Sequence, residues 1–220
     1  MKKLDKKVAV APVVAVAARH PELMTGTKAS VDTLQRATQR LSFRRVRDVL
    51  PGKIETPRLI LRAPMRGDVP AIVKLADNRN IAEKLSRLPS PYTRADAIAF
   101  VEIYAQRPDE RPFAITTHAG EFLGVVGFSY AMGQHPELGY WLGEPHWGKG
   151  IMTEAVKALL ETAFATGLYP VVRARALRTN AQSINVLEKA GFRNVGKGTM
   201  ERPGHAKGEP IFEFRREQPR

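Results

Sequence analysis

Short apolar segments of strand type alternate with longer helical segments along most of this chain, from Arg58 to its end. The strand segments are 58–62, 112–117, 121–130, 137–142, 171–177, 192–201 and 211–215, and the helical segments are 67–78, a stretch that Thr93 caps, 150–166 and 180–190. Segments in the order β-α-α-β-β-β-α-β-α-β-β predict one mixed sheet with helices packed on it. We therefore expect an α/β (α+β) fold.

The first 53 residues have a different character. They hold 12 of the 35 lysines and arginines but 4 of the 22 acidic residues, and so contribute +8 to the net charge of +13. Residues 1–18 weakly resemble a secretory signal, but Pro12 interrupts their Ala/Val run and we interpret them as an extension. The Pro51-Gly52 pair predicts a boundary between a basic extension over 1–53, partly disordered or helical, and a main domain over 54–220.

Within this extension, residues 29–48 predict a helix with a thin apolar stripe. Its polar side carries Arg36, Arg40, Arg44, Arg45 and Arg47. The arginines indicate either an anionic partner, such as RNA or a membrane surface, or a solvated basic face without a partner.

Composition excludes several classes of function. The chain has no cysteine, which excludes disulfides, thiolate metal ligands and a cysteine nucleophile. Its five histidines are not at metal-ligand spacing, so we expect no metal. No apolar run approaches the ~20 residues that span a bilayer. The absence of cysteine fits a reducing compartment, and we expect a cytoplasmic location.

A glycine-rich loop joins the strand at 137–142 to the helix at 150–166. Gly148 and Gly150 have no Cβ, so a pyrophosphate can approach the amides of the helix start, and Lys149 adds positive charge. These amides are unpaired and lie at the positive end of the helix dipole. By itself the loop favours a phosphate-bearing cofactor only weakly, because tight turns also use glycine for conformational reasons.

Further motifs accompany this loop. Residues 56–62 read Thr-Pro-Arg-Leu-Ile-Leu-Arg, 137–142 read Glu-Leu-Gly-Tyr-Trp-Leu, and 179–192 read Thr-Asn-Ala-Gln-Ser-Ile-Asn-Val-Leu-Glu-Lys-Ala-Gly-Phe. Together with Trp-Gly-Lys-Gly at 147–150 and Thr-Glu-Ala at 153–155, they resemble the RimJ/RimL-type branch of the GNAT N-acetyltransferase superfamily over nearly all of residues 55–215. The resemblance implies a GNAT domain with a mixed, mostly antiparallel sheet, a splay between two strands, and helices on both faces.

The resemblance also implies where acetyl-CoA binds. Backbone amides from Gly148 to Thr153 are expected to hold the pyrophosphate, and the pantetheine arm to lie in the splay, where it can pair with free strand amides. The expected cofactor-binding residues are Trp141, Leu142, Trp147, Gly148, Lys149, Gly150, Ile151, Met152, Thr153, Asn180 and Ser183. Trp147 and Met152 depart from the superfamily loop, which often begins with Gln or Arg and ends with Gly or Ala.

The reaction requires an amine that has lost its proton. We expect Glu137, at the head of its strand, to accept this proton directly or through water, although its position also fits a solvent-facing carboxylate. Glu201 is a second candidate. Many GNAT enzymes place a tyrosine in the later motif as general acid, but Leu187 occupies that position here, which leaves Ser183, water or no specific group as the proton donor.

Two functions remain open at this point. The first is direct transfer of an acetyl group from acetyl-CoA to a primary amine, either a protein N-terminal α-amine or a small-molecule amine, by a monomer or homodimer. The second is a non-catalytic acetyl-CoA-binding or RNA-associated adaptor, which the basic extension and the missing tyrosine favour. Thiol release from acetyl-CoA distinguishes them.

Overall fold

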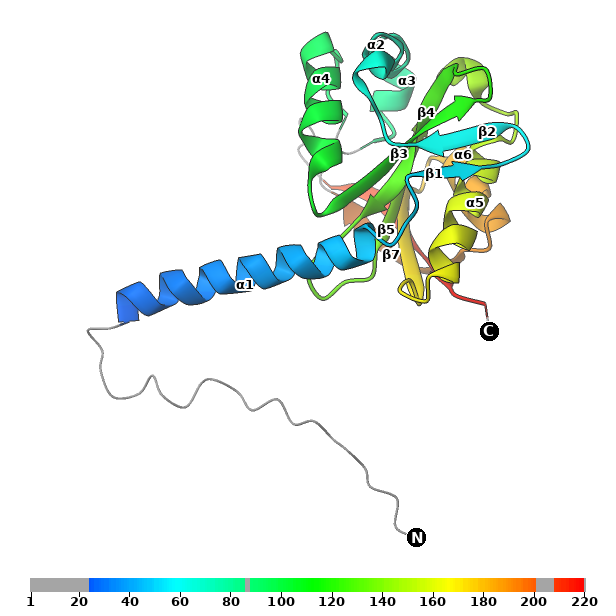
Figure 1. Ribbon diagram of the computed structural model, residues 1–220. Helices are drawn as coiled ribbons and strands as arrows, with labels where there is room; N and C mark the ends of the chain where they lie inside the picture. The colour runs from blue at the N-terminus through cyan, green and yellow to red at the C-terminus, as the bar shows by residue number, and fades with distance from the viewer. Residues whose placement is uncertain (1–23, 86–87, 201–207, 220) are drawn as a thin grey trace. The chain divides into compact units, whose positions relative to one another are not determined.

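One eight-stranded sheet organises the chain (Figure 1). The computed structural model describes residues 24–85, 88–200 and 208–219. The strands are β1 (Lys53–Glu55), β2 (Leu59–Arg62), β3 (Glu110–Thr117), β4 (Phe122–Ser129), β5 (Glu137–Leu142), β6 (Val171–Leu177), β7 (Arg193–Met200) and β8 (Glu209–Glu217). Their spatial order is β1-β2-β3-β4-β5-β6-β8-β7. Among the strand pairs that the structure describes, only β5–β6 is parallel, so the expected mixed and mostly antiparallel sheet is confirmed.

Helices cover both faces of this sheet. The described helices are α1 (Met24–Arg47), α2 (Val69–Ala76), α3 (Arg79–Ala82), α4 (Arg94–Glu102), α5 (Ile151–Ala165) and α6 (Ala181–Lys189), with 3-10 turns η2 (Arg66–Asp68), η3 (Tyr104–Gln106) and η4 (Glu144–His146). Residues of α5 and α6 share one hydrophobic cluster with the sheet, and residues of α2 and α4 share a second cluster with β3 and β4. The alternation of strand side chains explains the two clusters, since Val126 belongs to the first and its neighbour Val125 to the second.

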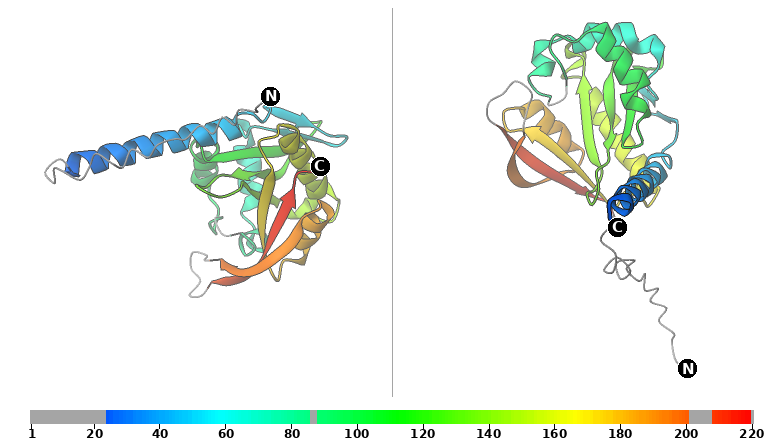
Figure 2. Two further views of the ribbon diagram at one scale, coloured as in Figure 1. Left: turned by 90° about the horizontal axis from the view of Figure 1, so that it is seen from below. Right: turned by 90° about the vertical axis from the view of Figure 1, so that its left-hand side faces the viewer.

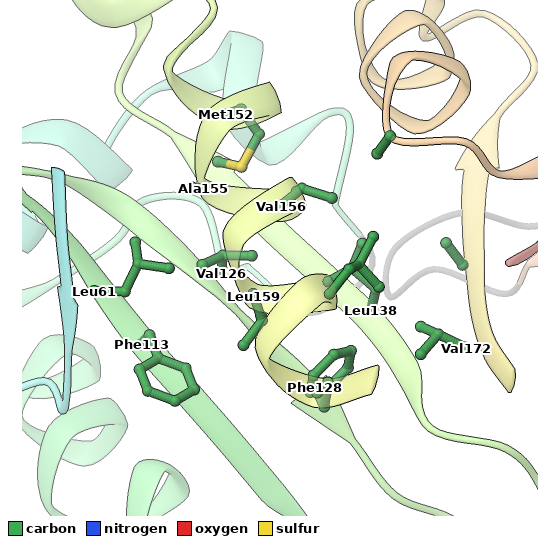
Figure 3. Packing of buried hydrophobic residues seen from close by; sticks show 14 of the residues in the cluster. Leu61, Phe113, Val126, Phe128, Leu138, Met152, Ala155, Val156, Leu159 and Val172 are labelled. Carbon is green, nitrogen blue, oxygen red and sulfur yellow. The ribbon is translucent and has the colours of Figure 1, made fainter. Parts of the chain in front are cut away.

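Helix α5 forms the centre of the larger cluster (Figure 3). Its buried side chains recur at helical spacing, and Met152, Val156 and Leu159 lie against the strands. Full burial of such a side chain contributes about 1.5–3 kcal/mol, so this face is a major source of stability. The same packing fixes the position of the first turn of α5 relative to the end of β5.

The expected elements are present, with local differences. The helix expected over 67–78 divides into η2 and α2, because Pro70 fits only at the start of an α-helix and the residues before it form a separate turn. Strand β1 and helix α3 were not expected, since segments of three and four residues are too short to show a periodicity.

The chain divides by its contacts into two units, Met1–Gln39 and Arg40–Arg220, and the boundary expected after residue 53 stays a prediction. Within the second unit, the last turns of α1 pack on the core. Phe43 stacks on Tyr130, with ring centroids 6.3 Å apart, and the Tyr169 hydroxyl donates a 2.9 Å hydrogen bond to the Val46 carbonyl.

The arginines of α1 differ from one another in their contacts. Arg40, Arg44 and Arg45 are exposed, whereas the Arg47 guanidinium donates to the carbonyl oxygens of Gln106 (3.3 Å) and Arg107 (2.9 Å). Arg47 therefore stabilises the second unit, and the anionic partner expected for the other arginines stays a prediction. The weak secretory-signal pattern at 1–18 lies outside the described residues.

Candidate active site

Strands β5 and β6 separate soon after they begin. They pair at Glu137–Arg173 and Leu138–Ala174 and nowhere further along, whereas β4 pairs with β5 over six residue pairs. Beyond the last pair, the facing edges of 139–142 and 175–177 have no ladder between them. This divergence is the expected splay. It opens a cleft of about 2120 Å³, larger than the 300–1,000 Å³ typical of a pocket for one small molecule, so a cofactor and an acceptor fit together.

The glycine-rich loop lines one end of this cleft. Gly148 and Gly150 have φ angles of +74° and +72°, in the left-handed region that only glycine adopts without strain, and Gly150 immediately precedes α5. No heavy atom lies within 4 Å of the Cβ position of Gly148, so the space above the loop is open to a ligand. The Trp147 indole donates a 2.7 Å hydrogen bond to the Leu142 carbonyl and so fixes the loop to β5.

A polar cluster behind this loop connects it and the first turn of α5 to the segment that precedes β2. The Glu154 carboxylate accepts hydrogen bonds from the Thr56 hydroxyl (2.6 Å), the Arg58 amide (3.1 Å) and the Arg58 Nε (2.6 Å). Arg58 Nη1 also donates to the Lys149 carbonyl, 3.0 Å away. Burial opposes ionisation of Glu154, but the hydrogen bonds from Thr56 and Arg58 together outweigh it and lower the pKa of the carboxyl.

The start of α6 approaches the cleft from the opposite wall. The Asn180 side chain accepts a 3.1 Å hydrogen bond from the Ser183 amide and so caps α6. The Ser183 hydroxyl lies 2.9 Å from the Tyr140 hydroxyl, which also donates to the Ser183 carbonyl at 3.1 Å. Burial raises the pKa of Tyr140, so this tyrosine keeps its proton at neutral pH.

Tyr140 was missed by the sequence analysis, although it stands in the Glu-Leu-Gly-Tyr-Trp-Leu motif. Its contact with Ser183 joins residues 43 positions apart, and spacing along the chain gives no signal of it. Leu187, at the position where many relatives have a tyrosine, is fully buried in the core.

Glu137 lies on the other face of β5. Side chains alternate along a strand, so Glu137 and Trp141 point to one face and Tyr140 to the opposite face. One Glu137 oxygen accepts a 2.8 Å hydrogen bond from Arg175 Nε, and the Glu137 side chain retains 25% of its exposure. Glu137 and Ser183 both line the cleft, so the candidate base and the candidate acid reach it from opposite faces of the sheet.

Most of the expected site residues gather here. The cleft is lined by Glu137, Trp141, Leu142, Trp147, Gly148, Gly150, Ile151, Met152, Thr153, Asn180 and Ser183. Lys149 does not line it, because its ammonium group donates to the Pro145 carbonyl, 2.9 Å away. Glu201 lies outside the described residues. Among the residues that are described, no group of three or more His, Asp or Glu is arranged to hold a metal ion, and no helix is long and apolar enough to cross a membrane.

A splayed pair of parallel strands followed by a glycine-rich helix start is the arrangement that the resemblance to the GNAT superfamily implies for an acetyl-CoA site. Residues 58–193 match the acetyltransferase (GNAT) domain family, and the chain belongs to this family. It is an acetyl-CoA-dependent N-acetyltransferase, as the motifs predicted.

Some known proteins are similar to the chain in sequence, and others are similar in fold. The probable N-acetyltransferase YjcK of Bacillus subtilis is 34% identical over 130 residues, which cover 55% of this chain and 72% of YjcK. The ribosomal L7/L12 α-N-protein acetyltransferase RimL, solved with coenzyme A, has a TM-score of 0.67 at 21% identity and covers 75% of this chain and 97% of its own. Spermidine N-acetyltransferase from Vibrio cholerae, solved with coenzyme A and spermine, has a TM-score of 0.63 at 20% identity over 74% and 97% of the two chains. The two structures share the fold.

Proposed function

We propose that this enzyme transfers the acetyl group of acetyl-CoA to a primary amine, either a protein N-terminal α-amine or a small-molecule amine, by direct attack in the cleft between β5 and β6. The observation that carries the proposal is the position of Glu137 and Ser183 on two walls of one cleft that begins at the glycine-rich loop. The structural relatives act on acceptors of both kinds, since one modifies a ribosomal protein and the other spermidine.

The cofactor is held from its phosphates to its thioester by different parts of the chain. The loop amides from Gly148 to Thr153 bind the pyrophosphate, because the first turn of α5 offers unpaired donors and the positive end of the helix dipole. The edges of 139–142 and 175–177 pair with the amides of the pantetheine arm. With acetyl-CoA bound in this way, we expect its thioester to lie in the part of the cleft that Glu137 and Ser183 line.

In the reaction, the amine nitrogen forms a bond to the acetyl carbonyl carbon and the carbon–sulfur bond breaks. The proton lost by the amine passes to Glu137, directly or through water, and then to solvent. The Ser183 hydroxyl donates a hydrogen bond to the departing thiolate, which the start of α6 also stabilises through its dipole. For this step the Tyr140 hydroxyl donates to the Ser183 hydroxyl, which leaves the Ser183 proton for the thiolate, and the thiolate takes its own proton from solvent.

Glu137→Gln tests the base. We expect turnover to fall by about 10²–10⁴ at pH 7 with an unchanged acetyl-CoA dissociation constant, and the loss to shrink at high pH, where more of the amine arrives neutral. The measurement is thiol release from acetyl-CoA with a panel of amines and N-terminal peptides. Glu161→Gln is the matched control, because Glu161 is exposed on α5 outside the cleft.

Equal turnover of wild type and Glu137→Gln at pH 7 would move the base role to Glu201 or to water. A matching loss of acetyl-CoA affinity would make Glu137 structural. Absence of thiol release with every amine, despite acetyl-CoA binding, would favour the non-catalytic adaptor.

A further inference from the structure

A row of arginines crosses the sheet beside Glu137. Glu137 is directly opposite Arg173 in the β5–β6 pair, Arg173 is opposite Arg215 in the β6–β8 pair, and Arg215 is opposite Arg193 in the β8–β7 pair. Residues that are directly opposite in neighbouring strands project from the same face of a sheet. The row therefore begins at the candidate base and continues over β6, β8 and β7, the strands that lie side by side at one edge of the sheet (Figure 2).

This row lies on the face away from α5 and α6. Val172, Ala174 and Phe214, the sequence neighbours of Arg173 and Arg215, point into the core cluster that contains α5 and α6. Alternation directs the arginines to the opposite face. Arg193 is exposed and the Arg215 side chain retains 46% of its exposure, so both guanidinium groups can reach a ligand.

Among the described ion pairs, one holds an arginine of the row. Glu137 accepts its hydrogen bond from Arg175, and Arg173 donates to the neutral amide oxygen of Gln134, 2.8 Å away. The carboxylate of Glu217 is 3.5 Å from Arg215 and 71% exposed, which makes it a weak partner. Within the described parts of the chain, Arg193 forms no ion pair. Like charges directly opposite one another destabilise a sheet, so an anion that spans the row relieves a repulsion as it binds.

The length of the row indicates the form of this anion. Strands lie about 4.8 Å apart, so three spacings from Glu137 to Arg193 cover about 14 Å. An extended peptide advances about 3.3–3.6 Å per residue, so about four residues span this distance. If the terminal amine of a peptide lies at Glu137, the residues that follow it therefore lie over the arginines.

We propose that the preferred acceptor is a polypeptide N-terminus followed by acidic residues, whose carboxylates bind the row formed by Arg173, Arg215 and Arg193. This inference rests on the proposed acetyl transfer and names its substrate class. Arg and carboxylate groups form strong charge-assisted hydrogen bonds, whereas the row repels a polyamine. Attraction by three guanidinium groups also accelerates the encounter with an acidic partner.

The test compares three peptides with the same N-terminal residue, followed by four acidic, four neutral or four basic residues. Both kcat/KM for acetyl transfer and the peptide dissociation constant, measured by fluorescence anisotropy with acetyl-CoA bound, are determined. We expect the order acidic, neutral, basic in both measurements, and a preference that weakens as salt rises. Spermidine and a short RNA are included as competing ligands.

Arg193→Gln is the principal variant, and Lys197→Gln is its matched control because Lys197 is exposed on the same strand and projects from the other face. We expect Arg193→Gln to weaken the acidic peptide about two- to fivefold and the neutral peptide not at all, and Lys197→Gln to change neither. The Tm and the acetyl-CoA dissociation constant are measured for both variants to confirm that they fold.

Equal kcat/KM values and equal dissociation constants for the three peptides would overturn the inference. A preference for spermidine would also overturn it, as would an effect of Arg193→Gln on RNA affinity but not on peptide affinity. Binding of the acidic peptide without acetyl transfer would uphold the docking row and reject the proposed reaction. Acetyl transfer to all three peptides at equal rates would uphold the proposed reaction and reject the docking row.

Discussion

The hydrogen bonds behind the glycine-rich loop predict how strongly the cofactor site depends on the carboxylate of Glu154. Glu154 accepts three hydrogen bonds from Thr56 and Arg58, and its side chain retains 18% of its exposure. Glu154→Gln keeps the size of the side chain but replaces one acceptor oxygen with an amide donor. That donor then faces either the Arg58 Nε–H or the Thr56 hydroxyl, and the arginine loses its counter-charge.

Hydrogen bonds to a charged group contribute about 1.5–3 kcal/mol, and a half-exposed ion pair adds at most about 1 kcal/mol. Because the Arg58 side chain is 52% exposed, we expect Glu154→Gln to lower the free energy of unfolding by about 2 kcal/mol. For a chain of this size 1 kcal/mol corresponds to about 2–4 °C, so the Tm should fall by about 4–8 °C. The acetyl-CoA dissociation constant should rise severalfold, because Arg58 also holds the Lys149 carbonyl.

The pH dependence has a definite sign. The pKa of Glu154 is lowered in the folded protein, so its contribution to stability is complete above the ordinary value of 4.5 and is lost as the pH falls through the folded pKa. The difference in Tm between wild type and Glu154→Gln, followed by circular dichroism, should therefore be full at pH 7 and shrink below about pH 4.5. Glu161→Gln, on the exposed side of α5, is the control. An unchanged Tm and an unchanged acetyl-CoA dissociation constant at pH 7 would refute the reasoning.

Three further perturbations follow from the contacts. Gly150→Glu should abolish the stabilisation by acetyl-CoA, about 2.7 kcal/mol at 100 times the dissociation constant, because it places a carboxylate on the pyrophosphate site at a φ of +72°; a retained thermal shift would contradict the site. Asp68→Asn should cost about 3–5 kcal/mol in urea unfolding, since the buried Asp68 accepts bonds of 2.6 and 2.8 Å from Arg62, and a loss below 1 kcal/mol would show that this pair is dispensable. Tyr169→Phe should cost about 1–3 kcal/mol by leaving the Val46 carbonyl unpaired, and an unchanged urea midpoint would mean that water replaces the hydroxyl.

The sequence predicted the fold well because its signals are local. The periodicity of the apolar residues of α5 and the exact bounds of β5 and β6 follow from residues adjacent in the chain. The glycines of the loop are also a local signal of its conformation, since positive φ angles restrict these positions to glycine.

What the sequence could not predict depends on contacts between distant segments. The Tyr140–Ser183 hydrogen bond joins β5 to the first turn of α6, and the spacing of the two residues along the chain does not indicate it. The arginine row requires a strand order in which β8 lies between β6 and β7, so the register of three strands has to be known before Arg173 and Arg193 can be related.

The splay has a consequence for cooperativity. Strands β1 to β5 and strands β6 to β8 are joined within the sheet by two residue pairs, whereas β3 and β4 alone share seven. Exchange of backbone amide hydrogens should therefore reveal two cooperative units that open with different free energies. An acetyl-CoA molecule whose amides bridge both edges would tie these units together, so that residues 139–142 and 175–177 gain protection at once. Bound acetyl-CoA then supplies the hydrogen bonds that β5 and β6 do not form with each other. The two parts of the sheet therefore open as one cooperative unit only in the complex.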